Sequence, residues 1–250
     1  MKRKNKSNIK SITIIIPVYN EEKFIQATIK KVIKSDTLSL KKEIIIVDDG
    51  SLDNTVKIIK QYIQEIGKQK NRHIELIEKK KNQGKGSALK LGFLKSKGDI
   101  VLVQDADLEY SPDEYPALIK PFIENNADCV YGSRFISSKP HRILYFWNYA
   151  MNKMLTTLSN ILTNLNLTDM ETGCKVFKGD IIRKIAKKIQ SKSFGIEPEI
   201  TAYLAKIKDI RIYEIGISYH GRTYNQGKKI KWTDGLKAIW EILKYNIFIK

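Results

Sequence analysis

Short runs of β-branched residues alternate with longer amphipathic stretches along the chain from residue 12 onward. The short runs lie between turn residues and are typical of strands: Ile12–Ile16, Glu43–Val47, His73–Ile77, Ile100–Gln104 and Cys129–Tyr131. Apolar residues recur at helical spacing in the stretches between them: Glu21–Lys34, Asn54–Ile66, Ser87–Lys95 and Pro112–Glu124. This alternation predicts an α/β fold, an open and mostly parallel sheet flanked by helices.

The regular alternation ends after Tyr131. Residues 141–165 are rich in aliphatic and aromatic side chains and predict one or two helices with a broad apolar face. A last strand is expected at Ile210–Ser218, followed by a polar loop and an amphipathic helix from Trp232 to about Tyr245. We therefore predict a basic tail over 1–10, one domain over 11–230 that includes the helices of 141–165, and an amphipathic C-terminal helix over 231–250.

The composition allows one sizeable core, because 42% of the 250 residues are hydrophobic. It excludes a disordered chain and a disulfide-bonded miniprotein. The two cysteines, Cys129 and Cys174, are too few for a four-thiolate metal site and are expected in the core. The run Ile12–Val18 is too short to span a membrane and lacks a cleavage site, and no segment reaches about 18 uninterrupted apolar residues. These features predict a cytoplasmic protein, either soluble or lying on a membrane surface.

A formal net charge of +18 indicates partners that carry phosphate: nucleic acid, nucleotide ligands or an anionic bilayer. Most of the basic residues are lysines, and the chain is also rich in isoleucine and asparagine. An AT-rich genome produces the same bias without any selection for binding. The charge alone therefore leaves both explanations open.

Acidic residues follow three of the predicted strands. Ligands gather at the carboxyl ends of strands in an open parallel sheet, so these residues are expected to share one edge. Asp105, Asp107 and Glu109 alternate in a stretch that we expect to be extended, with all three side chains on one side. Such oxygen ligands suit Mg²⁺ or Mn²⁺, although a solvated acidic turn is the simpler alternative. Their place after an apolar strand and near the acidic pair of the second strand favours a metal site.

Two basic segments could complete a site for a diphosphate. Residues 81–86 contain two glycines and precede a helix, whose N-terminus favours anions, but they do not form a Walker A loop. The second segment contains Arg222, Lys228 and Lys229, and its glycines, Gly221 and Gly227, would let it move as a lid. Ordinary solvated loops are the alternative for both.

Several motifs in series resemble family 2 glycosyltransferases of the GT-A fold, and among them the polyprenyl-phosphate hexose synthases, the dolichyl-phosphate mannose and glucose synthase group. The motifs are SITIIIPVYNEE (11–22), IIIVDDGSLDNT (44–55), NQGKGSAL (82–89), DADLE (105–109), YGSRF (131–135) and a late R-x-x-x-x-x-K (222–228). The resemblance covers roughly residues 11 to 230 and implies a nucleotide-sugar donor.

The resemblance also implies roles for individual residues. Those expected to bind the donor are Pro17, Tyr19, Glu21, Val47, Asp49, Lys85, Asp105 and Ala106. The metal would be held by Asp107 with Glu109 and Asp105, and Arg134, Arg222 and Lys228 would meet the diphosphate or the acceptor phosphate. Asp169, in TDMETGCK (168–175), would face the reacting centre, so that Asp107, Asp169 and Arg222 are the expected catalytic residues. A family lysine between YGSR and Arg222 has no evident match in this chain.

The implied reaction is metal-dependent transfer of a hexose from a UDP- or GDP-sugar to a polyprenyl phosphate, with inversion, at the cytoplasmic face of a membrane. An anionic phosphate needs no general base; a sugar or protein hydroxyl acceptor, the alternative within the family, would need one such as Asp169 or Glu171. The stretch Ile143–Leu165 is expected to lie in the membrane interface. It could equally pack on the protein's own core or on a second subunit, as in a homo-oligomer.

Two other classes fit the sequence less well. A nucleic-acid-binding module would use the positive charge, but no zinc finger or RNP-type segment is recognisable, and the acidic edge would repel phosphates. We therefore expect no nucleic-acid partner. A dinucleotide oxidoreductase would need G-x-G-x-x-G after the first strand, where this chain has PVYNE. A catalytically inactive relative that only binds its ligands is a further alternative.

Overall fold

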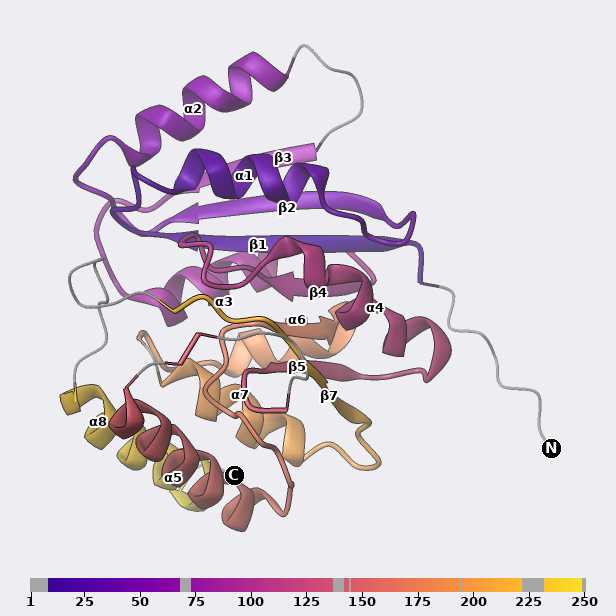
Figure 1. The fold of residues 1–250 in the computed structure, drawn as a ribbon, viewed down its shortest axis with the longest axis vertical. Coiled ribbons are helices and arrows are strands. Elements are labelled where there is room, and N and C mark those ends of the chain that lie inside the picture. The colour runs from indigo at the N-terminus through magenta and orange to yellow at the C-terminus, as the bar shows by residue number, and fades with distance from the viewer. Residues whose placement is uncertain are drawn as a thin grey trace.

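A seven-stranded mixed sheet organises the chain in the computed structural model, which describes residues 9–67, 73–136, 142–143, 145–193, 195–221 and 232–248. Its strands lie in the order β3-β2-β1-β4-β6-β5-β7 (Figure 1). Their bounds are β1 Ser11–Val18, β2 Lys41–Asp48, β3 His73–Glu78, β4 Ile100–Val103, β5 Cys129–Ser133, β6 Lys175–Lys178 and β7 Ile212–Gly216. Among the strands that the structure describes, β6 alone runs antiparallel to its neighbours, β4 and β5. The predicted open, mostly parallel sheet is confirmed.

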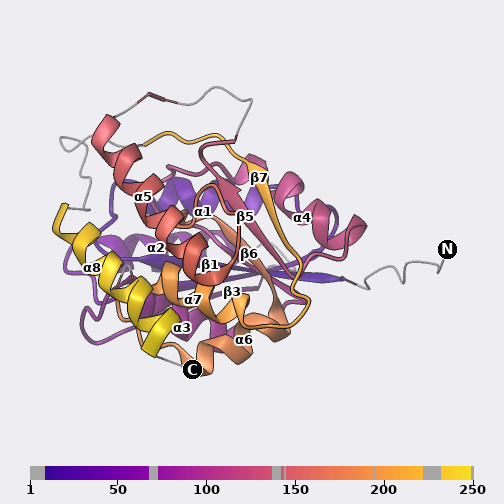
Figure 2. The same ribbon diagram turned by 90° about the horizontal axis from the view of Figure 1, so that it is seen from below.

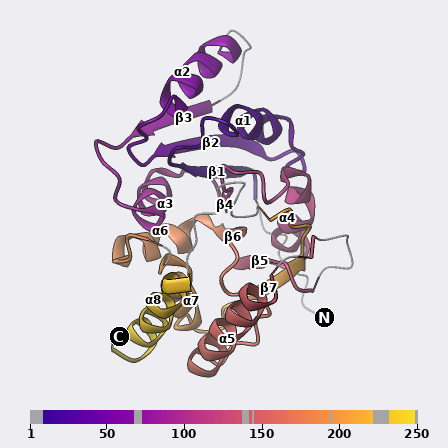
Figure 3. The ribbon, with the colours of Figure 1, turned by 60° about the vertical axis from the view of Figure 1, so that its left-hand side comes forward.

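Helices cover both faces of the sheet (Figure 3). The helices are α1 Ile25–Lys34, α2 Thr55–Ile66, α3 Lys85–Lys95, α4 Tyr115–Glu124, α5 Phe146–Thr163, α6 Gly179–Lys188, α7 Ile196–Ala205 and α8 Trp232–Leu243, with a short 3₁₀ turn before α4 and a π turn after α8. Side chains of β1 alternate between the two faces: Ile14 packs in the core under α1 and α4, and Ile15 packs in the core under α3, α6 and α7. Both residues are fully buried, as expected for a strand between two helical layers.

The predicted strands and helices of the first half are all present, with shifts of a few residues at their ends. Of the one or two helices predicted over residues 141–165, the described residues of this stretch contain one, α5. Three elements of the described residues were not predicted from the sequence: β6, α6 and α7. Strand β6 has only four residues with a lysine at each end, and α7 carries Glu197, Pro198 and Glu199 in its first turn, which disguises a buried helix.

Helices α5 and α8 lie side by side at one end of the molecule (Figure 2). A Cβ on Gly235 of α8 would lie 3.1 Å from the sulfur of Met151 of α5, so the two helices are in close contact. Ala238 and Ile242 of α8 are buried in the core beneath α3 and α7. None of the helices in the described segments is both long and apolar enough to cross a lipid bilayer.

Candidate functional site

The carboxyl ends of the parallel strands gather several polar segments at one edge of the sheet. Because β6 is antiparallel, its first residue, Lys175, pairs with Tyr131 of β5, and the chain before Lys175 lies toward the carboxyl end of β5. The loop 168–174 therefore lies at the same edge as the residues that follow β2, β4 and β5. This arrangement brings together Asp49, Asp105 and Asp107 from the first half of the chain with Arg134 and the loop 168–174 from the second half.

The turn after β2 is fixed by its two aspartates. Asp48 accepts hydrogen bonds from the amides of Gly50 and Ser51, each 3.0 Å long. Gly50 has φ +77°, and a Cβ there would lie 2.7 Å from the carbonyl carbon of Lys81. Glycine is therefore required for the close approach of this turn to the loop that precedes α3.

Asp49 holds the loop before α3. Its carboxylate accepts hydrogen bonds from the amides of Gly84 (2.6 Å) and Gln83 (3.2 Å) and forms an ion pair with Lys79. Asp49 is 3% exposed and Val47 is fully buried. The carboxylate of Asp49 is therefore bonded to the protein's own loop, and the binding of a nucleobase edge by Val47 and Asp49 stays a prediction.

The other residues expected around the nucleobase are also mostly enclosed. Pro17, Glu21 and Ala106 are buried, and the carbonyl of Ala106 accepts a hydrogen bond from Thr28 Oγ1 at 2.7 Å. Tyr19 is half-buried, so it is the member of this group whose side chain reaches the surface.

A chain of partly and fully buried ion pairs runs through the site. Lys85 Nζ lies 2.7 Å from Asp105 Oδ1 and 3.9 Å from Glu197 Oε1, and Glu197 in turn pairs with Lys175. Burial lowers the pKa of Lys85, but Asp105 and Glu197 outweigh burial and raise it, so Lys85 is charged. A Cβ on Gly173 would lie 2.4 Å from Asp105 Oδ2, which explains why the residue that packs on this pair is a glycine.

The acidic residues after β4 do not form the extended row that the sequence predicts. The strand ends at Val103, and residues 106–109 turn, with Leu108 at φ +59°. Asp107 Oδ1 accepts a hydrogen bond from the amide of Glu109 (3.2 Å), and Glu109 Oε2 accepts one from the hydroxyl of Tyr219 (2.9 Å). Among the described residues no three His, Cys, Asp or Glu side chains are grouped to hold a metal. The expected set of three ligands is therefore not preassembled, because Asp105 is turned toward Lys85.

Arg134 and Asp169 form a two-pronged ion pair. The guanidinium donates from Nε to Asp169 Oδ2 and from Nη2 to Oδ1, both at 2.7 Å. Arg134 Nη2 also donates to Asn152 Oδ1 of α5 at 3.2 Å. Asp169 is fully buried, and both of its carboxylate oxygens bind Arg134, so its role at the reacting centre stays a prediction. Its place is to hold Arg134 against α5.

A family model of "Glycosyl transferase family 2" matches residues 13–186 of the chain. The chain belongs to glycosyl transferase family 2. The resemblance inferred from the motifs is thereby confirmed, and with it the prediction that the protein is a glycosyltransferase.

Two relatives extend the match over most of this glycosyltransferase. UDP-N-acetylglucosamine–dolichyl-phosphate N-acetylglucosaminyltransferase of Methanococcus voltae is 29% identical over 94% of the chain and 95% of the relative. Undecaprenyl-phosphate 4-deoxy-4-formamido-L-arabinose transferase of Proteus mirabilis is 28% identical over 88% of the chain and 63% of the relative. Both names belong to transferases that act on polyprenyl phosphates.

The fold of this glycosyltransferase matches that of glucosyl-3-phosphoglycerate synthase of Mycobacterium tuberculosis, solved with Mn²⁺, UDP and phosphoglyceric acid. The TM-score is 0.70, over 95% of this chain and 79% of the other, at 17% identity. The same synthase has also been solved with Mg²⁺ and UDP. At this identity the likeness establishes the fold and confirms the GT-A type of sheet.

Some expected residues of the glycosyltransferase cannot be placed, and some contributors were missed. Arg222, Lys228 and Lys229 lie outside the described residues. The sequence reasoning missed Glu197 and Lys175, which carry the ion-pair chain, and Tyr219, which holds Glu109. A lysine within the apolar run 174–177 and two glutamates in the apolar run 196–204 were the available signals. The cysteines are both buried, as predicted.

Proposed function

We propose that this glycosyltransferase moves a hexose from a UDP- or GDP-sugar to a polyprenyl phosphate, with inversion at the anomeric carbon. The supporting observation is an edge that carries the pair of Lys85 and Asp105, the turn of Asp107 and Glu109, and Arg134, which is bonded to α5. The exposed side of α5 carries several large apolar residues. A charged donor and a lipid acceptor could meet there. The names of the two relatives agree with this acceptor, and the M. voltae enzyme's name favours a UDP-sugar.

Asp107 and Glu109 are the residues that we propose to hold Mg²⁺ or Mn²⁺. Both are partly exposed carboxylates on one turn, and carboxylate oxygen is the ligand type that these ions prefer. Asp105 fits this task less well, because its oxygen lies 2.7 Å from the ammonium of Lys85. A bound ion would neutralise charge on the departing diphosphate. Tyr19 offers an aromatic wall to the base, and Arg222 and Lys228 remain proposed diphosphate contacts.

The acceptor supplies its own nucleophile in this proposal. An oxygen of the phosphate dianion attacks the anomeric carbon as the bond to the diphosphate breaks, so no proton has to be removed. A hydroxyl acceptor would need a base. Asp169 is poorly suited to that task because it is fully buried and both its oxygens bind Arg134. A hydroxyl acceptor would therefore depend on Glu171, the other candidate base, whereas a phosphate acceptor needs neither residue.

A transfer assay tests the proposal directly. Purified enzyme with Mn²⁺ is expected to move labelled sugar from one of a panel of UDP- and GDP-sugars into the organic phase when polyprenyl phosphate is present. The matched control is the corresponding polyprenol, which lacks the phosphate and should receive nothing. Transfer to polyprenol or to sugar hydroxyls, with none to polyprenyl phosphate, would overturn the proposed acceptor.

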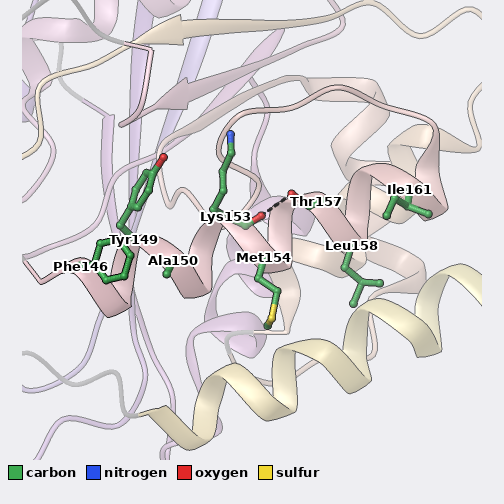
Figure 4. Close-up of a pocket in the computed structure, with 8 residues that line it drawn as sticks. All are labelled: Phe146, Tyr149, Ala150, Lys153, Met154, Thr157, Leu158 and Ile161. Carbon is green, nitrogen blue, oxygen red and sulfur yellow. Dashed lines mark hydrogen bonds between the residues drawn. The ribbon is translucent and has the colours of Figure 1, made fainter.

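We further propose that α5 and α8 lie against the cytoplasmic face of a membrane. Trp147 is 79% exposed, Ile161 72% and Phe146 66%, and Trp240 of α8 is 58% exposed. An open hollow of about 490 Å³ runs along α5 (Figure 4), lined by Phe146, Tyr149, Ala150, Lys153, Met154, Thr157, Leu158 and Ile161. An apolar helix face with a basic residue is typical of helices that lie in the interface of an anionic bilayer.

Flotation with vesicles tests this contact. The wild-type protein is expected to float with vesicles rich in anionic lipid, and the double variant Phe146→Ser/Trp147→Ser to remain largely in the aqueous fraction, because it loses apolar surface at the interface. Leu94→Ser, which changes an exposed leucine of α3, is the control and should float as the wild type does. If instead the double variant floats normally but a dimer dissociates, the surface joins two copies of the chain.

A further inference from the structure

Glu171 is the least expected group in the loop between Asp169 and Gly173. Its neighbours Met170 and Thr172 are fully buried, whereas Glu171 is only partly so. Its oxygen Oε1 is enclosed and has no hydrogen-bond partner among the described residues. An enclosed carboxylate oxygen without a partner is costly, so this oxygen requires either a proton or a ligand.

The positive charges near Glu171 do not neutralise its carboxylate. Glu197 of α7 and Asp169 of its own loop are negative, and Lys175 of β6 and Arg134 after β5 are positive. Both cations are already paired, Lys175 with Glu197 and Arg134 with Asp169. Burial first, and then the charge of Glu197, raise the pKa of Glu171 to about 7, against the weaker opposing effect of the two cations. A large share of the Glu171 side chains is therefore uncharged at neutral pH.

The loop that carries Glu171 is anchored to α5. Thr156 Oγ1 of this helix accepts a hydrogen bond from the amide of Met170 at 3.1 Å, and Asn152 Oδ1 accepts one from Arg134 at 3.2 Å. These contacts place the loop against the buried side of α5, since Thr156 is 1% exposed. In the proposal that follows, a lipid held by α5 presents its phosphate at this end of the site. The donor groups, Tyr19 and the turn of Asp107, come instead from the β1 and β4 side of the edge.

We propose that Glu171, in its protonated form, donates a hydrogen bond from its carboxyl O–H to the phosphate of the acceptor. This inference rests on the proposed function and specifies how the same site admits an anionic acceptor. A protonated carboxyl can donate a hydrogen bond, whereas an ionised one only accepts and would repel the phosphate. Binding of the acceptor and retention of the proton are therefore linked.

The pH dependence of acceptor binding follows from this linkage. Above about pH 7 most Glu171 side chains are ionised, and the acceptor binds only to the protonated fraction. The KM for polyprenyl phosphate is therefore expected to rise roughly tenfold per pH unit, compared with an enzyme that lacks this ionisable group. Glu171→Gln provides that reference, because its amide has the same shape, donates a hydrogen bond and does not titrate. The titration of the phosphate itself cancels in the ratio of the two KM values.

The kinetic experiment compares wild type and Glu171→Gln across this range. We expect similar kcat and KM below about pH 7, and a KM for the wild type that exceeds that of the variant increasingly above it. Glu199→Gln is the control, since Glu199 also has a raised pKa but binds the amides of Gln190 and Ser191 away from the acceptor side. The pH dependence of KM in this control should match the wild type.

Two results would overturn the inference. If Glu171→Gln is as inactive as Glu171→Ala, the residue works as an ionised base. If the ratio of the two KM values does not change with pH, Glu171 does not meet the acceptor. If the wild type does not use polyprenyl phosphate at all, the proposed function fails together with this inference. If the wild type does use it and the ratio of the two KM values is the same at every pH, only this inference fails.

A measurement without substrate checks the protonation itself. The folded-state pKa of Glu171, about 7, lies above its ordinary value of 4.5, so the folded chain binds more protons than the unfolded chain between these values. This group therefore destabilises the fold as pH rises from 4.5 to about 7. The gain in Tm of Glu171→Gln over wild type should grow across that window and level off above it; a constant difference contradicts a protonated Glu171.

Discussion

Replacing Asp107 with alanine is expected to lower kcat/KM for the nucleotide-sugar donor on the order of 10²–10³-fold, the loss typical when a preorganised group that stabilises developing charge is removed. Asp107 is partly exposed on the turn after β4 and is proposed to hold the ion beside the donor diphosphate. The transfer assay measures the loss, and titration with Mn²⁺ should show that the variant responds only at much higher metal concentration. The melting temperature should change little, because the side chain is not part of the core.

Asp113→Ala is the matched control for this variant. Asp113 lies in the same connection, is exposed, and accepts a hydrogen bond from the hydroxyl of Ser111 at 2.9 Å. Its removal should leave the donor kinetics within about twofold of the wild type, because the side chain is not proposed to touch the metal or the donor. The stability should change by only about 0.5 kcal/mol, as is typical of surface substitutions. An Asp107→Ala enzyme with wild-type turnover and unchanged dependence on Mn²⁺ would remove this carboxylate from the proposed mechanism.

The position of the acidic edge could be predicted from the sequence because it depends only on topology. Apolar runs alternating with amphipathic stretches require parallel strands, and parallel strands deliver the residues after each run to a common edge. Asp49, Asp107 and Arg134 lie there as expected. Neither the exact contacts nor the burial of each side chain is needed for that inference, which is why it succeeded over so much of the chain.

The partners of these charges could not be predicted, because they depend on how separate loops pack. Asp105 pairs with Lys85, which starts α3, and only because Gly173 leaves room for the contact. Leu108 adopts a left-handed conformation that a bulky residue rarely takes, and this turns Asp107 and Glu109 out of the expected extended row. The antiparallel β6 brings the loop 168–174 to the edge, and its four residues gave too little pattern to reveal it.

Breaking the buried pair of Arg134 and Asp169 is expected to have the largest effect on stability. Asp169 is fully buried and the side chain of Arg134 is 13% exposed, so removal of either partner leaves a charge enclosed without compensation. Asp169→Ala should therefore lower the free energy of unfolding by about 3–5 kcal/mol. Urea denaturation followed by circular dichroism measures this loss.

The double variant separates the interaction from the packing of the two side chains. Removing Arg134 and Asp169 together eliminates both charges, so Arg134→Ala/Asp169→Ala should be less destabilised than the sum of the two single variants.

The exposed pair of Lys60 and Glu78, with side chains 53% and 45% exposed, provides the control: Lys60→Ala should lower the free energy of unfolding by about 1 kcal/mol or less. Additive losses in the double variant, or an Asp169→Ala protein that unfolds at the wild-type urea concentration, would show that this pair does not hold the loop 168–174 against α5. A loop released in that way would also lose the enclosure of Glu171, so Asp169→Ala is expected to weaken the pH dependence of acceptor binding together with the fold.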